Sequence, residues 1–178
     1  MTSDAVRESL DALGVPYEVM PIDPAFADTA QFCEKYGIPL ANSANTIVVA
    51  SKKEPKLYCA CVVLATTRLD VNHTVRRLMG AARVSFATAE ETQALTGMMI
   101  GGVTVFALPP DMPLYVDERL MGLDWLILGG GSRSTKIPLP PTARERSSSS
   151  STARSCTANG RSSAWAAEPR ARSARIGF

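Results

Sequence analysis

Apolar residues recur at helical spacing in four stretches of the chain, and each stretch begins or ends at a residue typical of a helix cap. Two of the stretches also contain the spacing of a capping box, Asp28 with Gln31 and Thr88 with Glu91. The pattern therefore predicts four helices, at Asp4–Leu13, Asp28–Gly37, Asp70–Gly80 and Thr88–Gly97.

Short apolar or alternating runs bounded by turn residues predict about seven or eight strands. They are expected at Pro16–Met20, Asn45–Ser51, Leu57–Ala65, Val84–Ala87, Gly102–Leu108, Leu114–Asp117, Trp125–Leu128 and Lys136–Leu139. Several of these strands follow one another with no helix between them, which disfavours a doubly wound parallel sheet. The predicted fold class is α/β of the α+β kind, a mixed and mostly antiparallel sheet with about four surrounding helices.

Composition narrows the class of protein. With 178 residues, of which 46% are hydrophobic, the chain has the size and composition of one globular domain. The longest apolar run, Tyr58–Ala65, is too short to cross a bilayer. The first residues lack the basic and apolar regions of a secretory signal, so we expect a cytoplasmic protein whose four cysteines are free thiols.

The last forty residues differ from the rest of the chain. Residues 1–138 hold 12 Lys and Arg against 15 Asp and Glu, a net charge of −3, whereas residues 139–178 hold seven Arg and two Glu, a net charge of +5. This tail also contains nine Ser and eight Ala. The composition predicts a disordered tail at 139–178, after a domain at 1–138. It fits a nucleic-acid-binding tail, a solvated extension or an out-of-frame translation of a GC-rich gene.

Few residues of the chain point to a particular chemistry. His73 is the single histidine, so three-histidine zinc sites are excluded, and its position favours a solvated helix residue over a general base. Cys59 and Cys61 share one face of a strand and are interpreted as buried side chains rather than metal ligands. The glycine pair in Gly101–Thr104 fits either a β-bulge or a binding loop in which a ligand comes close to the backbone. Gly129–Arg133 fits either a structural turn or a rim that presents backbone N–H groups and Arg133 to a phosphate.

The order and spacing of several segments over residues 3–138 resemble the YbaK/EbsC family of aminoacyl-tRNA deacylases, which are related to the editing domain of bacterial prolyl-tRNA synthetases. The segments that carry the resemblance are Gly14–Val19, Ala44–Val49, Arg83–Glu91, Leu95–Gly97, Gly101–Thr104, Leu114–Asp117 and Gly130–Arg133.

The resemblance implies a metal-free and cofactor-free hydrolase that removes a small wrong amino acid, cysteine or alanine on proline tRNA, from the tRNA 3′ end. It implies that the substrate's own ribose hydroxyl helps to activate water, and that an aminoacyl-tRNA synthetase is a partner. The implied catalytic positions are Asn45, Thr46 and Asp117, and the implied substrate-binding positions are Phe26, Gly101, Gly102, Val103, Gly131 and Arg133. We expect the Gly101–Gly102 loop, Thr46 and Asp117 to converge on one small cavity.

The chain departs from the family pattern at three places. Asn45 stands where the family has a catalytic lysine, Val105 stands where a proline usually follows the glycine loop, and the tail replaces the closing segment beyond Ile137. Loss of the fixed cation predicts a weakened deacylase that Asn45→Lys would restore, with Arg133 or Lys136 as other sources of positive charge. The alternative function is a non-catalytic module that binds a tRNA end, a nucleotide or a small ligand.

Overall fold

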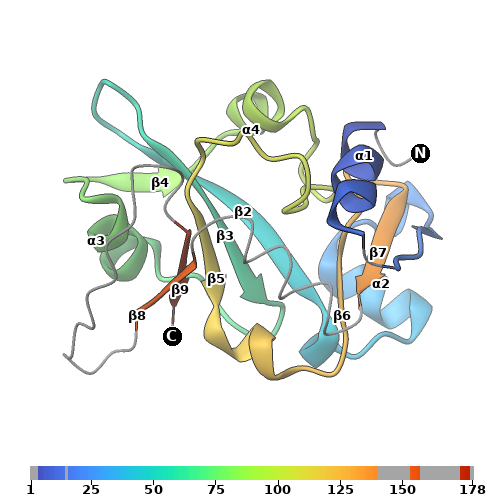
Figure 1. Ribbon diagram of the computed structural model, residues 1–178. Helices are drawn as coiled ribbons and strands as arrows, with labels where there is room; N and C mark the ends of the chain where they lie inside the picture. The colour runs from blue at the N-terminus through green and yellow to red at the C-terminus, as the bar shows by residue number, and fades with distance from the viewer. Residues whose placement is uncertain (1–3, 15, 140–152, 157–172, 177–178) are drawn as a thin grey trace.

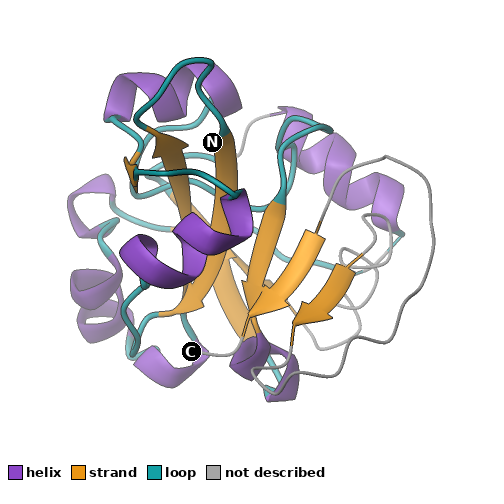
Figure 2. Ribbon diagram, turned by 90° about the vertical axis from the view of Figure 1, so that its left-hand side faces the viewer, coloured by secondary structure: helices purple, strands orange, loops and turns teal. Residues whose placement is uncertain are grey.

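The computed structural model describes residues 4–14, 16–139, 153–156 and 173–176. Its strands form two sheets, with helices packed around them (Figure 1, Figure 2). The larger sheet has the strand order β4-β2-β3-β5-β9-β8, and the smaller has the order β1-β7-β6. The predicted mixed α/β class is confirmed, although the strands are divided between two sheets rather than joined in one.

The larger sheet is built on the long hairpin of β2 and β3. β2 pairs antiparallel with β3 and with β4, whereas β3 pairs parallel with β5, which makes the sheet mixed. In the smaller sheet β7 pairs antiparallel with both β1 and β6. The strands of the two sheets up to residue 139 are β1 (Met20–Pro21), β2 (Ala44–Ser51), β3 (Tyr58–Leu64), β4 (Val84–Phe86), β5 (Leu114–Asp117), β6 (Leu126–Gly129) and β7 (Thr135–Leu139).

Helices and single helical turns connect these strands. The longer helices are α1 (Asp4–Leu13), α2 (Thr29–Tyr36) and α4 (Ala89–Thr96), and the π-helical turn η3 (Val71–Val75) continues directly into α3 (Arg76–Met79). Three 3₁₀ turns, η1 (Pro24–Phe26), η2 (Leu40–Asn42) and η4 (Glu118–Gly122), lie beside strand ends. All four predicted helical segments are therefore present, and Asp70 and Gly80 cap the η3–α3 segment as expected.

The main core lies between the two sheets. Residues of β2 and β3 such as Val48 and Val62 pack there with Leu128 of β6 and Ile137 of β7, and Leu10 of α1 joins them. A second cluster on the other face of the larger sheet joins β2, β3 and β5 to η3. A third packs α2 against the smaller sheet. Because β2 borders the first two clusters, its position and direction are held from both sides.

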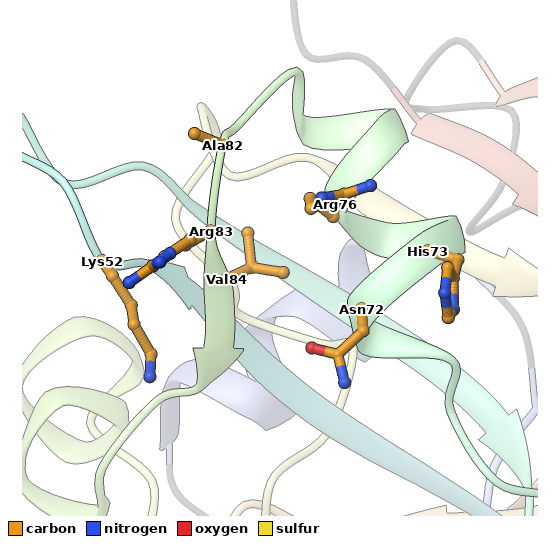
Figure 3. Close-up of a pocket in the computed structure, with 7 residues that line it drawn as sticks. All are labelled: Lys52, Asn72, His73, Arg76, Ala82, Arg83 and Val84. Carbon is orange, nitrogen blue, oxygen red and sulfur yellow. The ribbon is translucent and has the colours of Figure 1, made fainter.

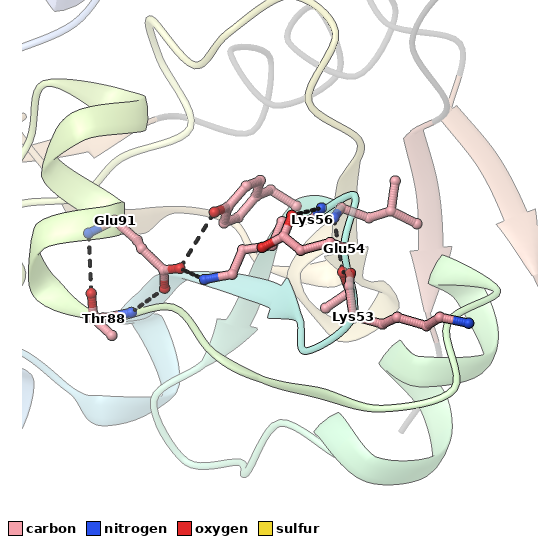
Figure 4. A network of polar contacts seen from close by, with 8 residues as sticks. Lys53, Glu54, Lys56, Thr88 and Glu91 are labelled. Carbon is pink, nitrogen blue, oxygen red and sulfur yellow. Dashed lines mark hydrogen bonds and ion pairs between the residues drawn. The ribbon is translucent and has the colours of Figure 1, made fainter.

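A polar network joins α4 to the hairpin of β2 and β3 (Figure 4). Thr88 and Glu91 form the predicted capping box at the start of α4. The same Glu91 carboxylate accepts hydrogen bonds from the Lys56 ammonium and, at 3.3 Å, from the Tyr58 hydroxyl. The Lys56 ammonium in turn lowers the pKa of Glu91. The network fixes the helix that precedes the glycine loop.

Two of the predicted strands are wrong in large part. Residues 102–108 form turns and irregular loop instead of a strand, and Ala107 among them has a φ angle of 60°, which an extended strand does not allow. Val103 and Phe106 are nevertheless buried, so their apolar pattern reflects a buried loop. Of the strand expected at Pro16–Met20, only Met20 pairs with β7, together with Pro21.

The tail predicted to be disordered begins at Leu139, which instead belongs to β7 and is buried. Two short strands are described beyond it, β8 (Ala153–Cys156) and β9 (Ser173–Ile176), and β9 pairs parallel with β5. The other residues of the tail lie outside the described part of the chain. The domain boundary and the origin of the tail stay predictions.

Candidate active site

A cavity of about 210 Å³ lies at the amino end of β2. Its wall is formed by four segments that are far apart in the sequence. They are the junction of η1 and α2, the start of β2, the glycine loop after α4, and the neighbouring strands β6 and β7, which contribute Ala27, Asp28, Thr29, Ala44, Asn45, Thr46, Ile47, Ile100, Gly101, Val103, Gly129 and Lys136. The cavity therefore depends on the packing of both sheets rather than on one loop.

Lys136 of β7 supplies a buried positive charge to this cavity. The residue is 6% exposed, and its ammonium donates hydrogen bonds to the carbonyl oxygens of Ala27, at 3.0 Å, and Gly101, at 3.3 Å. It also lies 5.1 Å from the centre of the Phe32 ring. No carboxylate among the described residues forms an ion pair with it. Burial lowers the pKa of Lys136 below its ordinary value.

An ammonium group has three N–H donors, and two of those of Lys136 are used by backbone carbonyls. The third donor has no acceptor among the described residues. A buried cation that is in no ion pair is costly, and an anionic group entering the cavity would relieve that cost further than the more distant attraction of the Asp28 carboxylate does. The arrangement can therefore attract a developing negative charge and stabilise it.

Two polar residues at the start of β2 line the same cavity. The Thr29 hydroxyl donates a hydrogen bond to the Asn45 side-chain oxygen, which leaves the Asn45 amide N–H₂ available for a ligand. The Thr46 hydroxyl is buried and has no hydrogen-bond partner among the residues that the structure describes. Buried hydroxyl groups are normally paired, so an unpaired one in a cavity wall marks a place for a ligand or a water. Asn45 and Thr46 are two of the three positions predicted to be catalytic.

The glycine loop lies against the turn between β6 and β7. Gly102 is buried, and a Cβ atom on it would lie 2.7 Å from Ser132 Cα. Its carbonyl accepts a hydrogen bond of 2.8 Å from the N–H of Gly131. Gly101 has a φ of 91°, and a Cβ on it would meet the Arg133 guanidinium at 2.5 Å. These glycines are thus required for close packing of two loops, and only Gly101 and Val103 of this segment line the cavity.

Arg133 lies behind the cavity wall. Its guanidinium donates hydrogen bonds to the carbonyls of Ile100, at 3.0 Å, and Pro24, at 3.3 Å, and lies 3.6 Å from the Asp28 carboxylate. Arg133 thereby ties the glycine loop to the η1–α2 junction. Asp28 uses its carboxylate there and makes no capping hydrogen bond to α2, contrary to the capping box predicted with Gln31.

The expectation that Asp117 lies at the same cavity as Thr46 and the glycine loop is wrong. Asp117 does not line the cavity, and its fully buried carboxylate accepts hydrogen bonds from the Arg119 side chain, at 3.0 and 2.8 Å, and from the Arg119 N–H. It caps η4. Phe26 also lies outside the cavity wall, with its ring 5.2 Å from the Lys35 ammonium. Gly131 takes part in loop packing and does not line the wall.

From the sequence, Lys136 was named only as one of two other sources of positive charge, and Ala27, Asp28 and Thr29 were not named as site residues. A charged residue inside an otherwise apolar strand was the available signal for Lys136, since Thr135, Ile137 and Leu139 on either side are buried. The η1–α2 residues gave no such signal, because their part in the site depends on tertiary packing. Within the described residues no cluster of His, Cys, Asp and Glu could hold a metal, and no helix is long and apolar enough to cross a membrane.

Comparison with known proteins agrees with this architecture. A family model for the aminoacyl-tRNA editing domain matches residues 23–146. The chain therefore belongs to the aminoacyl-tRNA editing domain family, as the resemblance of its segments predicted.

Solved structures show the same fold. The chain is similar to the crystal structure of the hypothetical protein APE2540, with 22% identity, 97% of this chain and 98% of that chain covered, and a TM-score of 0.72. It is also similar to the structure of a candidate trans-editing enzyme for prolyl tRNA synthetase, with 23% identity, 84% and 94% coverage, and a TM-score of 0.70. These matches establish the fold of the chain.

Proposed function

We propose that this chain is an aminoacyl-tRNA deacylase that hydrolyses the ester of a small amino acid at the tRNA 3′ end. The observation that carries the proposal is Lys136, a buried ammonium with one unused donor in a cavity whose wall also holds Asn45 and Thr46. Membership of the editing domain family supports a tRNA ester as the substrate. The solved structure described as a candidate trans-editing enzyme for prolyl tRNA synthetase supports proline tRNA in particular.

The chemistry needs a group that stabilises negative charge. Water attacks the ester carbonyl carbon, charge builds on the carbonyl oxygen, and the bond from that carbon to the ribose oxygen then breaks as the ribose oxygen takes a proton. The Lys136 ammonium stabilises the developing oxyanion, and the Asn45 amide and the Thr46 hydroxyl orient the aminoacyl group. Removal of one preorganised donor to an oxyanion typically lowers a rate by about 10²–10³.

The size of the cavity favours a small aminoacyl group. At about 210 Å³ it is smaller than the roughly 300–1,000 Å³ of pockets that hold drug-sized ligands. Cysteine or alanine on proline tRNA, the class predicted from the sequence, fits this limit better than an aromatic amino acid. A synthetase partner, which the resemblance also implies, stays a prediction.

A single-turnover deacylation assay tests the proposal. We expect the full chain to hydrolyse Cys- or Ala-charged proline tRNA faster than correctly charged proline tRNA, and Lys136→Met to lower that rate by about 10²–10³. Lys35→Met is the matched control, because Lys35 is exposed and does not line the cavity. Thermal melting of both variants shows whether each is folded.

The same assay separates the proposal from the second candidate, a binding module without activity. Asn45, which stands where the resemblance implies a catalytic lysine, favours this alternative. Tight binding of Cys- or Ala-charged proline tRNA without hydrolysis of either would contradict the proposed deacylase activity and support the binding module. Equal rates for folded Lys136→Met and Lys35→Met would show that the buried ammonium is not part of the reaction.

A further inference from the structure

A cluster of cations lines two adjoining hollows beside β4 and α3, toward the carboxyl end of β2, whereas the cavity described above, here called the ester cavity, lies at the amino end of β2. The hollows have volumes of about 430 and 470 Å³ and share His73 and Arg76. Figure 3 shows Lys52 and Arg83 projecting from neighbouring segments, with His73 and Arg76 on the helical segment beside them. We call the four side chains that are charged at neutral pH, Lys52, Arg76, Arg77 and Arg83, the basic surface.

The four cations of the basic surface differ from three other cations of the chain that are held in ion pairs. Lys56 is paired with Glu91, Arg119 with Asp117 and Arg133 with Asp28. In contrast, all four residues of the basic surface are exposed, and none of them forms an ion pair with a carboxylate in the described part of the chain. Asp70, the acid nearest to Arg76 and Arg77 in the sequence, is already bonded to His73 and Thr74.

This grouping is unexpected from the overall charge, because residues 1–138 have a net charge of −3. Like charges that repel one another are held together by the fold. The N–H of Lys52 donates a hydrogen bond of 3.0 Å to the carbonyl of Arg83, and Gly80 closes the helix that carries Arg76 and Arg77. Several cations that line adjoining hollows and form no ion pair among the described residues are suited to a ligand with several negative charges, and phosphate groups are the usual ones.

The basic surface stands at a definite distance from the ester cavity. Asn45 lines the cavity near the beginning of β2, and Lys52 follows directly after the end of β2. Seven residues of extended strand span roughly 23 Å, at about 3.3 Å per residue. A stacked nucleic-acid strand advances about 3.4 Å per nucleotide, so the two regions are about seven stacked nucleotides apart.

We propose that the basic surface binds the sugar-phosphate backbone of the tRNA acceptor arm while the aminoacylated 3′ end occupies the cavity. This inference rests on the proposed function for the identity of the nucleic acid. The cations would contact phosphates and carry no sequence information, so they would contribute affinity for any tRNA. Choice of the amino acid would then belong to the cavity alone.

Binding of an uncharged proline tRNA transcript to the full chain, measured by fluorescence anisotropy at several salt concentrations, tests the proposal. Each phosphate contact contributes about 0.7–0.9 to the slope of log K against log salt. We expect the double variant Arg76→Gln and Arg83→Gln to reduce the magnitude of that slope by about 1.5 and to weaken binding at low salt. The control, Arg7→Gln with Lys35→Gln, removes the same charge from exposed sites elsewhere and should leave the slope nearly unchanged.

A second substrate separates this proposal from the proposed function. A tetranucleotide carrying the same 3′ aminoacyl ester is too short to reach the basic surface, so the double variant and wild type should hydrolyse it at equal rates. Equal salt slopes for the double variant and the control would overturn the proposal, whatever the hydrolysis rates. Absence of hydrolysis by wild type would contradict the deacylase, while the anisotropy result would still decide whether the basic surface binds RNA.

Discussion

Lys136 and Asp117 are two buried charged residues with opposite surroundings. The Asp117 carboxylate is fully buried and has every nearby donor it needs, from the Arg119 guanidinium and the Arg119 N–H. The Lys136 ammonium is 6% exposed, donates hydrogen bonds to two backbone carbonyls, forms no ion pair within the described part of the chain, and lines a cavity. A charged group that is in an ion pair within the fold contributes to stability, whereas a charged group that lines a cavity and is in no ion pair is available to a ligand.

The comparison changes the assignment made from the sequence. The resemblance placed an acid of the Leu114–Asp117 segment near the pocket and made Lys136 only a second source of positive charge. The ion pair of Asp117 with Arg119 favours a structural role for Asp117, and the position of Lys136 in the cavity wall favours a role in the site. Perturbed and uncompensated ionisable groups in clefts are more often functional than those in complete ion pairs. Three substitutions test this conclusion, beginning with the one of largest expected effect.

Gly102→Ala tests whether the surroundings of Lys136 depend on the close packing of the glycine loop against the turn between β6 and β7. A Cβ on Gly102 would overlap the backbone of Ser132, so the glycine loop and the turn between β6 and β7 would have to move apart. The Gly101 carbonyl, which accepts a hydrogen bond from Lys136, belongs to the same glycine loop. We expect the free energy of unfolding to fall by about 1–3 kcal/mol, the usual cost of overpacking. Gly122→Ala is the matched control, because a Cβ on Gly122 would meet nothing within 4 Å. Urea unfolding of both variants measures the difference, and equal stabilities would contradict the loop-packing interpretation.

Asp117→Asn tests whether Asp117 has a structural rather than a catalytic role. The substitution keeps the shape and one acceptor but removes the charge from the paired hydrogen bonds with Arg119, so we expect a loss of about 1–2 kcal/mol in unfolding free energy. Hydrolysis per folded molecule should not change, because Asp117 is outside the cavity wall. Asp111→Asn, at an exposed aspartate, should stay within about 0.5 kcal/mol of wild type. A hundredfold loss of hydrolysis with unchanged stability would restore Asp117 as a catalytic residue.

Features that depend on neighbouring residues could be predicted from the sequence. α1 has the predicted bounds, and the Thr88–Glu91 capping box is present, because a capping box is decided by residues three apart. The hairpin of β2 and β3 also follows from its apolar runs and the turn between them. These elements are predictable because their cause lies within one short segment.

Features that depend on distant contacts could not be predicted in the same way. The loop at residues 102–108 packs through Gly102 against Ser132, a contact that no local pattern reveals. The pairing of Asp117 is decided by the side-chain position of Arg119, and the exposure of Lys136 to a cavity is decided by α2 and the glycine loop. For the candidate site, residues at the start of β2 and in the glycine loop that line the cavity were named from the sequence, whereas Lys136 was named only as a second source of charge, beside Arg133.

Asn45→Lys is the substitution of smallest expected effect, and it sharpens the comparison further. The sequence alone predicts a gain in hydrolysis of one to three orders of magnitude, because it assumes that the cavity lacks a cation. With Lys136 in place, a second ammonium would repel the first within a cavity of about 210 Å³ and would lose the hydrogen bond from Thr29. We therefore expect the rate of single-turnover deacylation to change by less than about tenfold, or about 1.4 kcal/mol.

The decisive measurement for Asn45→Lys is a double-mutant cycle with Lys136→Met. If the two positions can supply the same charge, Asn45→Lys should raise hydrolysis more in the Lys136→Met background than in wild type, whereas Asn45→Met should raise it in neither. A hundredfold gain for Asn45→Lys in the presence of Lys136 would show that Lys136 does not stabilise the oxyanion. The cavity would then lack its catalytic cation, and Lys136 would belong with Asp117 among the charges that the fold alone requires.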